Sequence, residues 1–394
     1  MTDALLTLNA GSSSIKFCLF ELGGGELVRA AEGQIEGVGV APHLVARQGD
    51  QVVSARKWPA GEGLTHEALL GELLAWVDDH LGGDRLRAVG HRIVHGGPEF
   101  SAPVRLDAGV VARLDALAPL APLHQPHNLA AVRAVAKARP SLPQVACFDT
   151  AFHHGHAPEV DRFGLPREWE ARGVRRYGFH GLSYEFISGR MRALDGALAA
   201  GRMIVAHLGN GASLCAIRDG RSVDTTMGFT ALDGLVMGTR CGALDPGVIL
   251  YLETEHGLTA KAVEDMLYRR SGLLGVSQLS SDMRTLLGSA DPRARDAIDL
   301  FVFRVVREIG ALAASMGGLD GLVFTAGIGE RSPAIRRRVC ERLGWLGVRL
   351  DEAANARGGG LISPPGAAPS VWAIATDEEL VIARHTRDLV AATA

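Results

Sequence analysis

One pattern constrains the fold of this chain more than any other: an apolar strand, a glycine-rich turn and a second apolar strand. It occurs twice, half a chain apart, with the first turn at residues 11–14 and the second at residues 209–211. A partial third copy leads from the apolar residues 322–324 into a glycine turn at residues 326–329. Such hairpins are common, so coincidence is one explanation. The other is a pair of domains with related topology.

Helices are predicted between these strands. Residues 69–81 and residues 298–312 place apolar side chains at the three- and four-residue spacing of one helix face. Thr376 followed by Glu379 matches a capping box, which predicts the start of a last helix that reaches Val390. Strands that alternate with helices, with glycine turns at strand ends, indicate an α/β protein.

The length of 394 residues favours two domains, at about 150 residues each. We expect the first domain to comprise residues 1–150 together with residues 376–394, the last helix packing back onto it. We expect the second domain to comprise residues 151–375.

Charge and cysteine content exclude several classes of protein. The chain has 41 basic and 44 acidic side chains, a net charge of −3, which argues against nucleic acid or anionic lipid as a partner. Its five cysteines have the spacing of neither a disulfide framework nor a zinc site. Residues 1–3 lack a basic signal-peptide start, and residues 297–316 contain too many charges to span a membrane. We therefore expect a cytoplasmic protein without membrane or nucleic-acid partners.

The glycine turns are candidate phosphate sites, although the chain has no Walker loop and no complete dinucleotide fingerprint. Glycine, serine and asparagine let backbone N–H groups approach phosphate oxygens closely. Asn9 and Ser14 add side-chain donors beside the first turn, and Lys16 adds a cation. Any single turn could be an ordinary hairpin, but three in one chain favour a nucleotide.

Three arginine- and histidine-containing segments have glycine neighbours, around Arg92, His180 and Arg240. Each arginine alone could brace a loop or form a surface salt bridge. Together these side chains could converge on a phosphoryl group and neutralise its charge.

Two carboxylates and a group of histidines complete the candidates. Asp149 follows an apolar strand, a usual position for ligand chemistry in α/β sheets. Glu378 lies in the first turn of the last helix, where the helix dipole alone favours an acidic residue. The histidines at positions 153, 154 and 156 resemble a metal site, but we expect them to be solvated in a loop.

Motifs that cover nearly the whole chain resemble those of the acetate kinases, in the same order. They are residues 8–17, 91–97, 148–153, 175–181, 207–211, 238–240 and 325–330. The resemblance implies an actin-like ATPase (ribonuclease H-like) fold of two duplicated domains, shared with sugar kinases and heat-shock chaperones, with the active site in a cleft between the domains. It also implies a homodimer that uses ATP and Mg²⁺, with Mn²⁺ as a substitute.

The resemblance also implies roles for individual residues. Those matching the family's catalytic positions are Asp149, His180 and Arg240, and those matching its Mg²⁺ site are Asn9 and Glu378. Residues matching substrate contacts are Arg92 for the carboxylate and Val94, Leu123, Phe179 and Ala231 for the acyl group.

Matches to the family's nucleotide contacts lie mostly in the second expected domain, which the resemblance makes the nucleotide-binding one. They are Ser14 and Lys16 at the phosphates, then His207, Leu208, Gly209, Asn210, Gly211, Asp282, Met283, Arg284, Gly327, Ile328, Gly329, Glu330 and Arg331.

Several positions depart from the family pattern. Arg331 and Asp377 each replace an asparagine, Gln125 replaces another, Ala243 replaces an aspartate, and Ala231 replaces a proline beside the acyl group. None removes a proposed catalytic group. They leave the nucleotide preference and the acyl-chain selectivity open.

The reaction implied by the resemblance is reversible in-line transfer of the ATP γ-phosphoryl group to acetate. Acetate is ionised at neutral pH, so Asp149 is expected to position a group rather than to act as a base. One alternative is a kinase for propionate or another short carboxylate, and another is a kinase for a hydroxyl substrate such as a sugar. A different class is a non-catalytic ATP-binding switch of the same fold.

Overall fold

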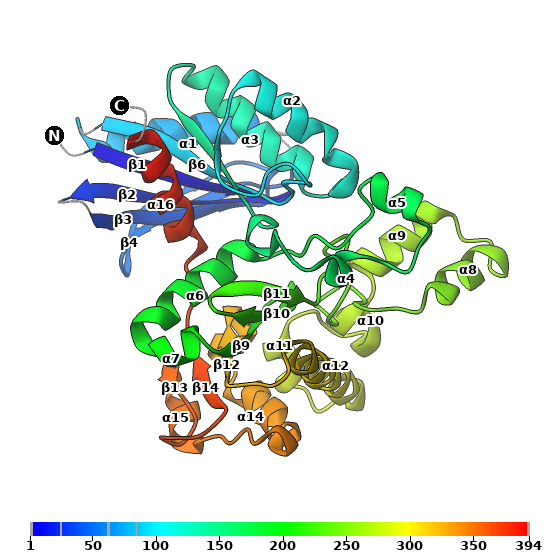
Figure 1. Cartoon of the computed structure of the whole chain (residues 1–394). Coiled ribbons are helices and arrows are strands. Elements are labelled where there is room, and N and C mark those ends of the chain that lie inside the picture. Colours follow the sequence, from blue (N-terminus) through cyan, green and yellow to red (C-terminus); the bar gives the residue numbers. More distant parts are fainter. Residues whose placement is uncertain (1–2, 24–25, 61–63, 84, 392–394) are drawn as a thin grey trace. The chain divides into compact units, whose positions relative to one another are not determined.

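The computed structural model describes residues 3–23, 26–60, 64–83 and 85–391 (Figure 1). The chain divides into two compact units: Met1–Phe152 with Asp377–Ala394, and His153–Thr376. The division expected from the sequence, after residue 150 and before residue 376, differs by two residues and by one residue from these limits. Met1 and Thr2, considered above for a signal peptide, lie outside the described residues.

The first unit contains an eight-stranded sheet in the order β5-β4-β3-β2-β1-β6-β8-β7. Strands β1 to β3 are antiparallel neighbours, whereas β6 is parallel to β1 and β8 is parallel to β6. The strands are β1 (Asp3–Ala10), β2 (Ser14–Gly23), β3 (Glu26–Glu36), β4 (His43–Gln48), β5 (Gln51–Lys57), β6 (Arg85–Ile93), β7 (Val104–Arg105) and β8 (Gln144–Phe148).

Helices cover both faces of this sheet. They are α1 (His66–Leu81), α2 (Ala108–Ala116), α3 (Gln125–Ala138) and α16 (Glu378–Ala391), with a 3₁₀ turn η1 (Ala118–Leu120). Helices α1 and α3 lie on one face of the sheet and α16 lies on the other (Figure 1). Side chains alternate between the faces of a strand: Phe17 packs in the core with α1 and α3, whereas Phe20 packs against Ala383 of α16. A side chain at Gly90 of β6 would collide with Thr386 and Ile382, so this glycine lets α16 approach closely. The predicted helix at residues 69–81 is confirmed.

The second unit contains a six-stranded sheet in the order β11-β10-β9-β12-β14-β13. Strands β11, β10 and β9 are antiparallel neighbours, and β12 is parallel to both β9 and β14. The strands are β9 (Arg202–Leu208), β10 (Ala212–Arg218), β11 (Arg221–Thr225), β12 (Gly321–Thr325), β13 (Gly360–Leu361) and β14 (Ser370–Ala373). Read in this direction, β11-β10-β9-β12-β14 repeats β3-β2-β1-β6-β8 of the first unit, so the prediction of two related topologies is confirmed.

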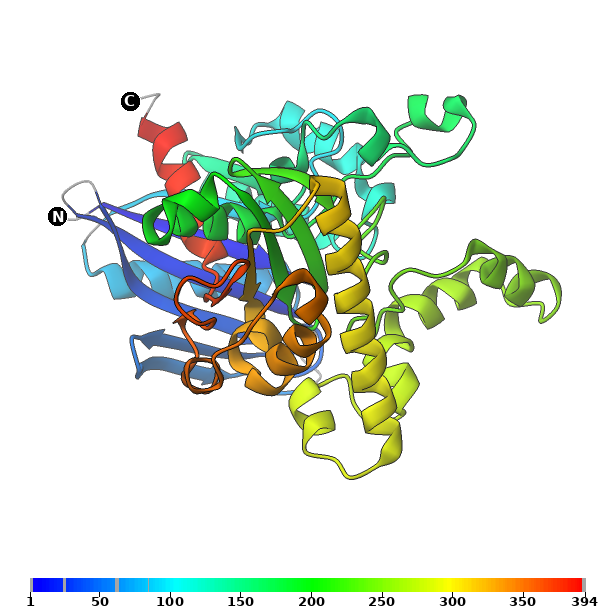
Figure 2. The same ribbon diagram turned by 60° about the horizontal axis from the view of Figure 1, so that its bottom comes forward.

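The longest helix of the second unit, α12, packs along β9, β10 and β11 (Figure 2) and confirms the helix predicted at residues 298–312. The helices here are α4 (Pro158–Asp161), α5 (Arg167–Ala171), α6 (Gly181–Leu194), α7 (Gly196–Ala199), α8 (Pro246–Thr254), α9 (Ala260–Arg269), α10 (Gly272–Ser277), α11 (Met283–Leu287), α12 (Pro292–Met316), α13 (Ala326–Arg331), α14 (Pro333–Arg342) and α15 (Glu352–Arg357), with 3₁₀ turns η2 (Ala151–His153) and η3 (Gly344–Leu346). Within the described residues, no helix combines the length and apolarity needed to cross a membrane.

The partial third copy of the pattern is not a hairpin. Strand β12 has parallel neighbours on both sides, and parallel strands cannot be joined by a tight turn. The chain therefore leaves β12 through a left-handed residue, Ala326 (φ 62°), into helix α13. Two hairpin turns remain, and in the first the Gly11 N–H donates to the Ser14 carbonyl over 2.8 Å.

The cap of the last helix also differs from the sequence prediction. Helix α16 begins at Glu378, and the Leu380 N–H donates to Asp377 Oδ1 at 3.0 Å. The Thr376 hydroxyl is buried and has no hydrogen-bond partner within the described residues. Asp377 is therefore the N-cap residue, because the helix starts one residue later than a capping box at Thr376 requires.

We expect Asp377→Ala to lower the free energy of unfolding by about 1 kcal/mol, the usual loss of an N-cap acceptor. Thr376→Val should leave stability unchanged or raise it, since it replaces an unpaired buried hydroxyl by a methyl group of similar size. Asp377 also accepts from Arg29 Nη2 at 2.6 Å. Asp377→Asn keeps an oxygen for the helix cap but loses the negative charge that pairs with Arg29, so this variant separates the two contacts. Urea unfolding measures all three variants, and an equal loss in Thr376→Val and Asp377→Ala would contradict the assignment.

Candidate functional site

In the first unit, three predicted site residues meet where neighbouring strands end. Asn9 is near the end of β1, Arg92 near the end of the adjacent β6, and Asp149 directly follows β8. Arg92 Nε donates to Asp149 Oδ1 at 2.9 Å and Nη2 donates to Oδ2, which makes the pair bidentate. Arg92 Nη1 also donates to Asn9 Oδ1 at 3.2 Å. The parallel arrangement of β1, β6 and β8 thus brings these three side chains together at one edge of the sheet.

Glu378, in the first turn of α16, joins this group. Its Oε2 lies 3.9 Å from Arg92 Nε. Burial raises the pKa of Glu378 to about 7; Arg92 and Lys16 oppose the rise, and the Asp149 and Glu379 carboxylates add to it. Burial disfavours the charge on Arg92, but Asp149 and Glu378 outweigh it and raise the pKa of the guanidinium. The site therefore holds a permanent cation among carboxylates that repel one another.

The oxygens of this group fit a magnesium ion. The described residues include no cluster of three or more His, Cys, Asp or Glu side chains that could hold a metal. Mg²⁺, however, keeps several waters and takes only one or two protein carboxylates besides phosphate oxygens. Glu378 offers one carboxylate and Asn9 an amide oxygen. Burial and the Asp149 and Glu379 carboxylates raise the pKa of Glu378, so a bound cation would favour its ionised form.

Arg92 retains binding capacity. The three bonds above use three of the five N–H donors of its guanidinium, which leaves two for another anion. Lys16 is exposed on β2, and Ser14 at the start of β2 closes the glycine turn through its carbonyl. Arg92 on β6 and the pair Ser14 and Lys16 on β2 thus lie on the two strands that flank β1.

Asn128 of α3 is a residue that the sequence interpretation missed. Its Nδ2 donates to the Ala10 carbonyl at 2.6 Å, and its Oδ1 accepts the Val94 N–H at 2.9 Å. It therefore fixes the end of β1 to the segment after β6. A polar residue within an apolar helix stripe was the available signal. Of the acyl-contact residues, Val94 is buried and Leu123 half-buried in this unit, while Phe179 and Ala231 belong to the second unit.

In the second unit, His180 and Arg240 approach the same glycine turn. A side chain at Gly211 would lie 3.4 Å from His180 Nε2 and 3.9 Å from Arg240 Nη1. Arg240 Nη1 donates to the Ala231 carbonyl at 2.9 Å. A Cβ at Gly238 would meet Asn210 Oδ1 at 1.9 Å, so the two loops touch at a position where only glycine fits. The structure thus brings together the two predicted phosphoryl-stabilising side chains of this unit.

His180 is held by its neighbours. It adopts a left-handed conformation (φ 59°) directly before helix α6. Its Nδ1 lies 2.8 Å from Ser213 Oγ, and its ring stacks on His207 with centroids 4.1 Å apart. The His207 Nδ1 is in turn 2.8 Å from Ser183 Oγ. These contacts fix the orientation of the ring.

A cavity of about 760 Å³ in the second unit collects most of the predicted nucleotide contacts, and its volume suits a nucleotide. It is lined by Gly209, Asn210, Ser281, Asp282, Met283, Arg284, Leu287, Gly327, Ile328, Arg331, Ser332, Pro333 and Ala334. The remaining predicted contacts, His207, Leu208, Gly211, Gly329 and Glu330, are not among the lining residues. Gly329 and Glu330 instead offer their carbonyls to the buried Arg336.

One expectation about side chains near this site needs correction. The histidines were expected to be solvated, but His153 and His156 are buried and only His154 is exposed. Both are hydrogen-bonded within the fold, which the local sequence could not show. The loop-bracing alternative applies to Arg176, whose Nη1 donates to the carbonyls of Thr225 and Met227 at 3.0 Å each.

Comparison with known proteins agrees with this geometry. The model of the acetokinase family matches residues 4–384. The chain belongs to the acetokinase family. An acetate kinase of Rhodopseudomonas palustris is 56% identical over 393 residues, which cover 98% of each chain.

Two solved structures of acetokinase relatives resemble this chain over nearly their full length. A propionate kinase from Francisella tularensis has 34% identity and a TM-score of 0.90, covering 98% of this chain and 99% of its own. The Porphyromonas gingivalis acetate kinase has 37% identity and a TM-score of 0.88, covering 98% and 100%. The predicted actin-like α/β fold is confirmed.

The raised pKa of Glu378 predicts a pH dependence of stability in metal-free protein. Between about pH 4.5 and 7 the unfolded chain ionises this carboxyl while the folded chain keeps it protonated, so the free energy of unfolding falls as pH rises. Glu378→Gln removes this fall. Its stability relative to the natural protein should therefore increase from pH 5 to pH 8, by about 3 kcal/mol at most.

Unfolding in the presence of EDTA at several pH values measures this difference. Glu21→Gln, on β2 of the same unit, is the matched control for the loss of a glutamate carboxyl. A constant difference between Glu378→Gln and the natural protein across this pH range would contradict the buried, protonated carboxyl.

Proposed function

We propose that this acetokinase transfers the γ-phosphoryl group of ATP to acetate, reversibly and by direct in-line displacement, giving acetyl phosphate and ADP. The observation that carries the proposal is Arg92: a half-buried guanidinium fixed by Asp149 and Asn9, with two N–H donors left for a carboxylate. The name of the Rhodopseudomonas palustris relative supports acetate as that carboxylate.

Asp149 acts by holding Arg92, and not as a base. Both of its carboxylate oxygens accept from Arg92. Acetate resembles a glutamate side chain, with a pKa of about 4–5, and is already a nucleophile at neutral pH. The difficulty of the reaction is the meeting of two anions. Arg92 neutralises the acetate, and His180 and Arg240 neutralise the charge that spreads over the phosphoryl oxygens.

Asn9 and Glu378 would hold the Mg²⁺ ion, or Mn²⁺ in its place. When bound, the ion neutralises phosphate oxygens of the nucleotide. Glu378 loses its proton when it binds the cation, because a metal ligand must be ionised. Ser14 and Lys16 of the first glycine turn bind phosphate oxygens.

The second unit binds the nucleotide in the cavity beside Gly209 and Asn210. The backbone N–H groups of this turn suit phosphates, and the base and ribose occupy the space towards α11 and α13. Arg331 lines the cavity with a largely exposed side chain, 3.4 Å from Glu330 Oε1. Its side chain can therefore change conformation to suit different nucleotides.

We infer a homodimer that uses helix α8. No residue of α8 is buried, although Leu250 is 61% and Tyr251 54% exposed. Helices α8 and α9 extend away from the sheet of their unit (Figures 1 and 2). A second copy of the chain would cover this apolar helix. A cytoplasmic location agrees with the five cysteines, which are all free thiols.

A hydroxylamine assay tests the function. Acetate, ATP and Mg²⁺ should yield acetyl hydroxamate, which a sugar kinase or an ATP-binding switch cannot form. Arg240→Ala should lower kcat by about 10²–10³-fold with little change in ATP affinity, since it removes a charge-stabilising contact. Arg92→Ala should mainly raise the KM for acetate.

The exposed Arg218→Ala on β10 is the control for a lost arginine and should behave as the natural protein. Absence of acetate-dependent hydroxamate would overturn the proposed reaction. Near-normal kcat in Arg240→Ala, or an unchanged acetate KM in Arg92→Ala, would overturn the role of that residue alone.

Propionate is the second candidate substrate, because one similar solved structure is a propionate kinase and Ala231 is smaller than proline. One methylene in an apolar pocket changes kcat/KM by about 10–200-fold. We expect acetate to be preferred at the low end of this range. Ala231→Pro should widen the preference, since its ring fills the wall and fixes the backbone.

This substitution keeps the Ala231 carbonyl that accepts from Arg240, so kcat for acetate serves as the internal control. The measurement is kcat/KM for acetate and propionate in both proteins. An unchanged ratio would show that position 231 does not set chain length.

A further inference from the structure

Four side chains of the second unit form a continuous buried chain of hydrogen bonds. His153 Nε2 lies 2.9 Å from the Phe179 carbonyl, and His153 Nδ1 lies 2.8 Å from Ser222 Oγ. Ser222 Oγ is also 2.8 Å from His156 Nε2, and His156 Nδ1 is 3.1 Å from Asp161 Oδ1. We call these four side chains the His153–Asp161 relay.

The four hydrogen bonds of the relay need one more proton than its side chains provide in their neutral forms. Both ends, the Phe179 carbonyl and the Asp161 carboxylate, only accept. Four hydrogen bonds therefore need four protons, whereas two neutral imidazoles and one hydroxyl supply three. Either one histidine is an imidazolium or one hydrogen bond is lost.

The extra proton belongs on His156. Burial lowers the pKa of His153 to about 3, so its ring is neutral, with its single proton on Nε2 towards the Phe179 carbonyl. The hydroxyl of Ser222 then donates to His153 Nδ1 and accepts from His156 Nε2. His156 must use both nitrogens as donors, and its charge is balanced by Asp161.

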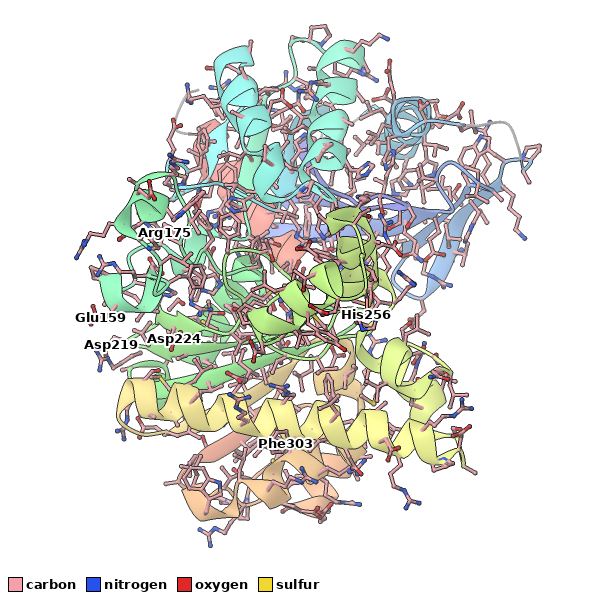
Figure 3. The ribbon with its side chains drawn as sticks, turned by 90° about the vertical axis from the view of Figure 1, so that its right-hand side faces the viewer. Glu159, Arg175, Asp219, Asp224, His256 and Phe303 are labelled. Carbon is pink, nitrogen blue, oxygen red and sulfur yellow. The ribbon has the colours of Figure 1, made fainter. Side chains whose placement is uncertain are left out.

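The other groups around the relay agree with this assignment. Arg175, which is labelled in Figure 3, donates to the second carboxylate oxygen of Asp161. Cys215 Sγ donates to Ser222 Oγ at 3.2 Å, which fills the second lone pair of that oxygen. Tyr184 meets the His153 ring edge-on at 5.6 Å. More distant charges are Arg176, which disfavours a charge on His153, and Asp224, which acts on Cys215.

The relay ends beside a strained residue of the proposed active site. The Phe179 carbonyl belongs to the peptide that precedes His180, whose left-handed conformation costs about 1–2 kcal/mol for a residue other than glycine. A side chain at Gly178 would lie 2.6 Å from two atoms of the His153 ring. The ring thus both packs against the Gly178 backbone and donates to the next carbonyl, so it holds this segment from two sides.

We propose that His153, Ser222, His156 and Asp161 are positioning residues for His180, and that they work with His156 as a buried imidazolium. The relay fixes the Phe179–His180 peptide, and Ser213 fixes the ring, so that His180 keeps its orientation without substrate. This inference rests on the proposed role of His180 in phosphoryl transfer. A side chain that only filled the core would not need the extra proton.

Ser222→Ala breaks the relay at its centre. It should lower kcat by about 10–100-fold, the effect of a small misplacement of a catalytic group, while KM for ATP and acetate changes much less. The matched control is His154→Gln, an exposed histidine between the two buried ones, which should leave kcat unchanged.

Asp161→Asn separates positioning from charge. Its amide N–H can donate to His156 Nδ1, so all four hydrogen bonds form with neutral histidines, and its oxygen still accepts from Arg175. This variant should retain most of the kcat that Ser222→Ala loses. A loss as large as that of Ser222→Ala would overturn the relay.

Nitrogen NMR of histidine-labelled protein reports the protonation states directly. At pH 7 His156 should be an imidazolium and His153 a neutral ring protonated on Nε2, and Asp161→Asn should make His156 neutral. A neutral His156 in the natural protein would overturn the proposal even if a variant failed to fold. His180→Ala tests the underlying function separately: full activity there would refute the role of His180 but leave the protonation result intact.

Discussion

The charge on Arg92 has to be satisfied where β1, β6 and β8 end, because a half-buried guanidinium without partners costs several kcal/mol. Asp149 supplies both carboxylate oxygens and Asn9 adds an amide oxygen. These groups meet because β1, β6 and β8 are parallel neighbours, so the site depends on the strand order of the sheet. The position of α16 follows from it as well, since Glu378 adds a further carboxylate that the Arg92 charge stabilises.

The second unit holds its arginine, Arg240, through different contacts. Its five matching strands again place a glycine turn after the first strand, at residues 209–211, next to a crossover helix, α13. Arg240, beside this turn, donates to the Ala231 carbonyl at 2.9 Å, whereas Arg92 of the first unit donates to the Asp149 carboxylate. The arginine of the first unit is thus held by a carboxylate, and that of the second unit is held by a backbone carbonyl.

Local sequence patterns predicted much of the fold and of the candidate site. Both hairpins, the helices around Leu73 and Phe301, and the place of Asp149 after a strand depend on apolar periodicity and turn residues a few positions apart. The cap at Asp377, the helix after β12 and the burial of His156 were not predicted. The helix after β12 and the burial of His156 depend on partners distant in sequence, which are β9 and β14 beside β12 and Ser222 beside His156. The cap contact at Asp377 is local, but Asp377 also pairs with the distant Arg29. Periodicity carries no information about such partners.

Both units therefore fix charges before any substrate arrives. Arg92 is locked by two oxygens of one carboxylate, and His180 is held by stacking on His207 and by the bond to Ser213. Preorganised charges stabilise a transition state without the reorganisation that water would require. With its extra proton, the His153–Asp161 relay adds preorganisation from residues that do not touch the reacting groups. A residue keeps the left-handed conformation only where the surrounding structure constrains it. For His180 the constraint comes from His153, whose neutral ring donates its single proton from Nε2 to the Phe179 carbonyl.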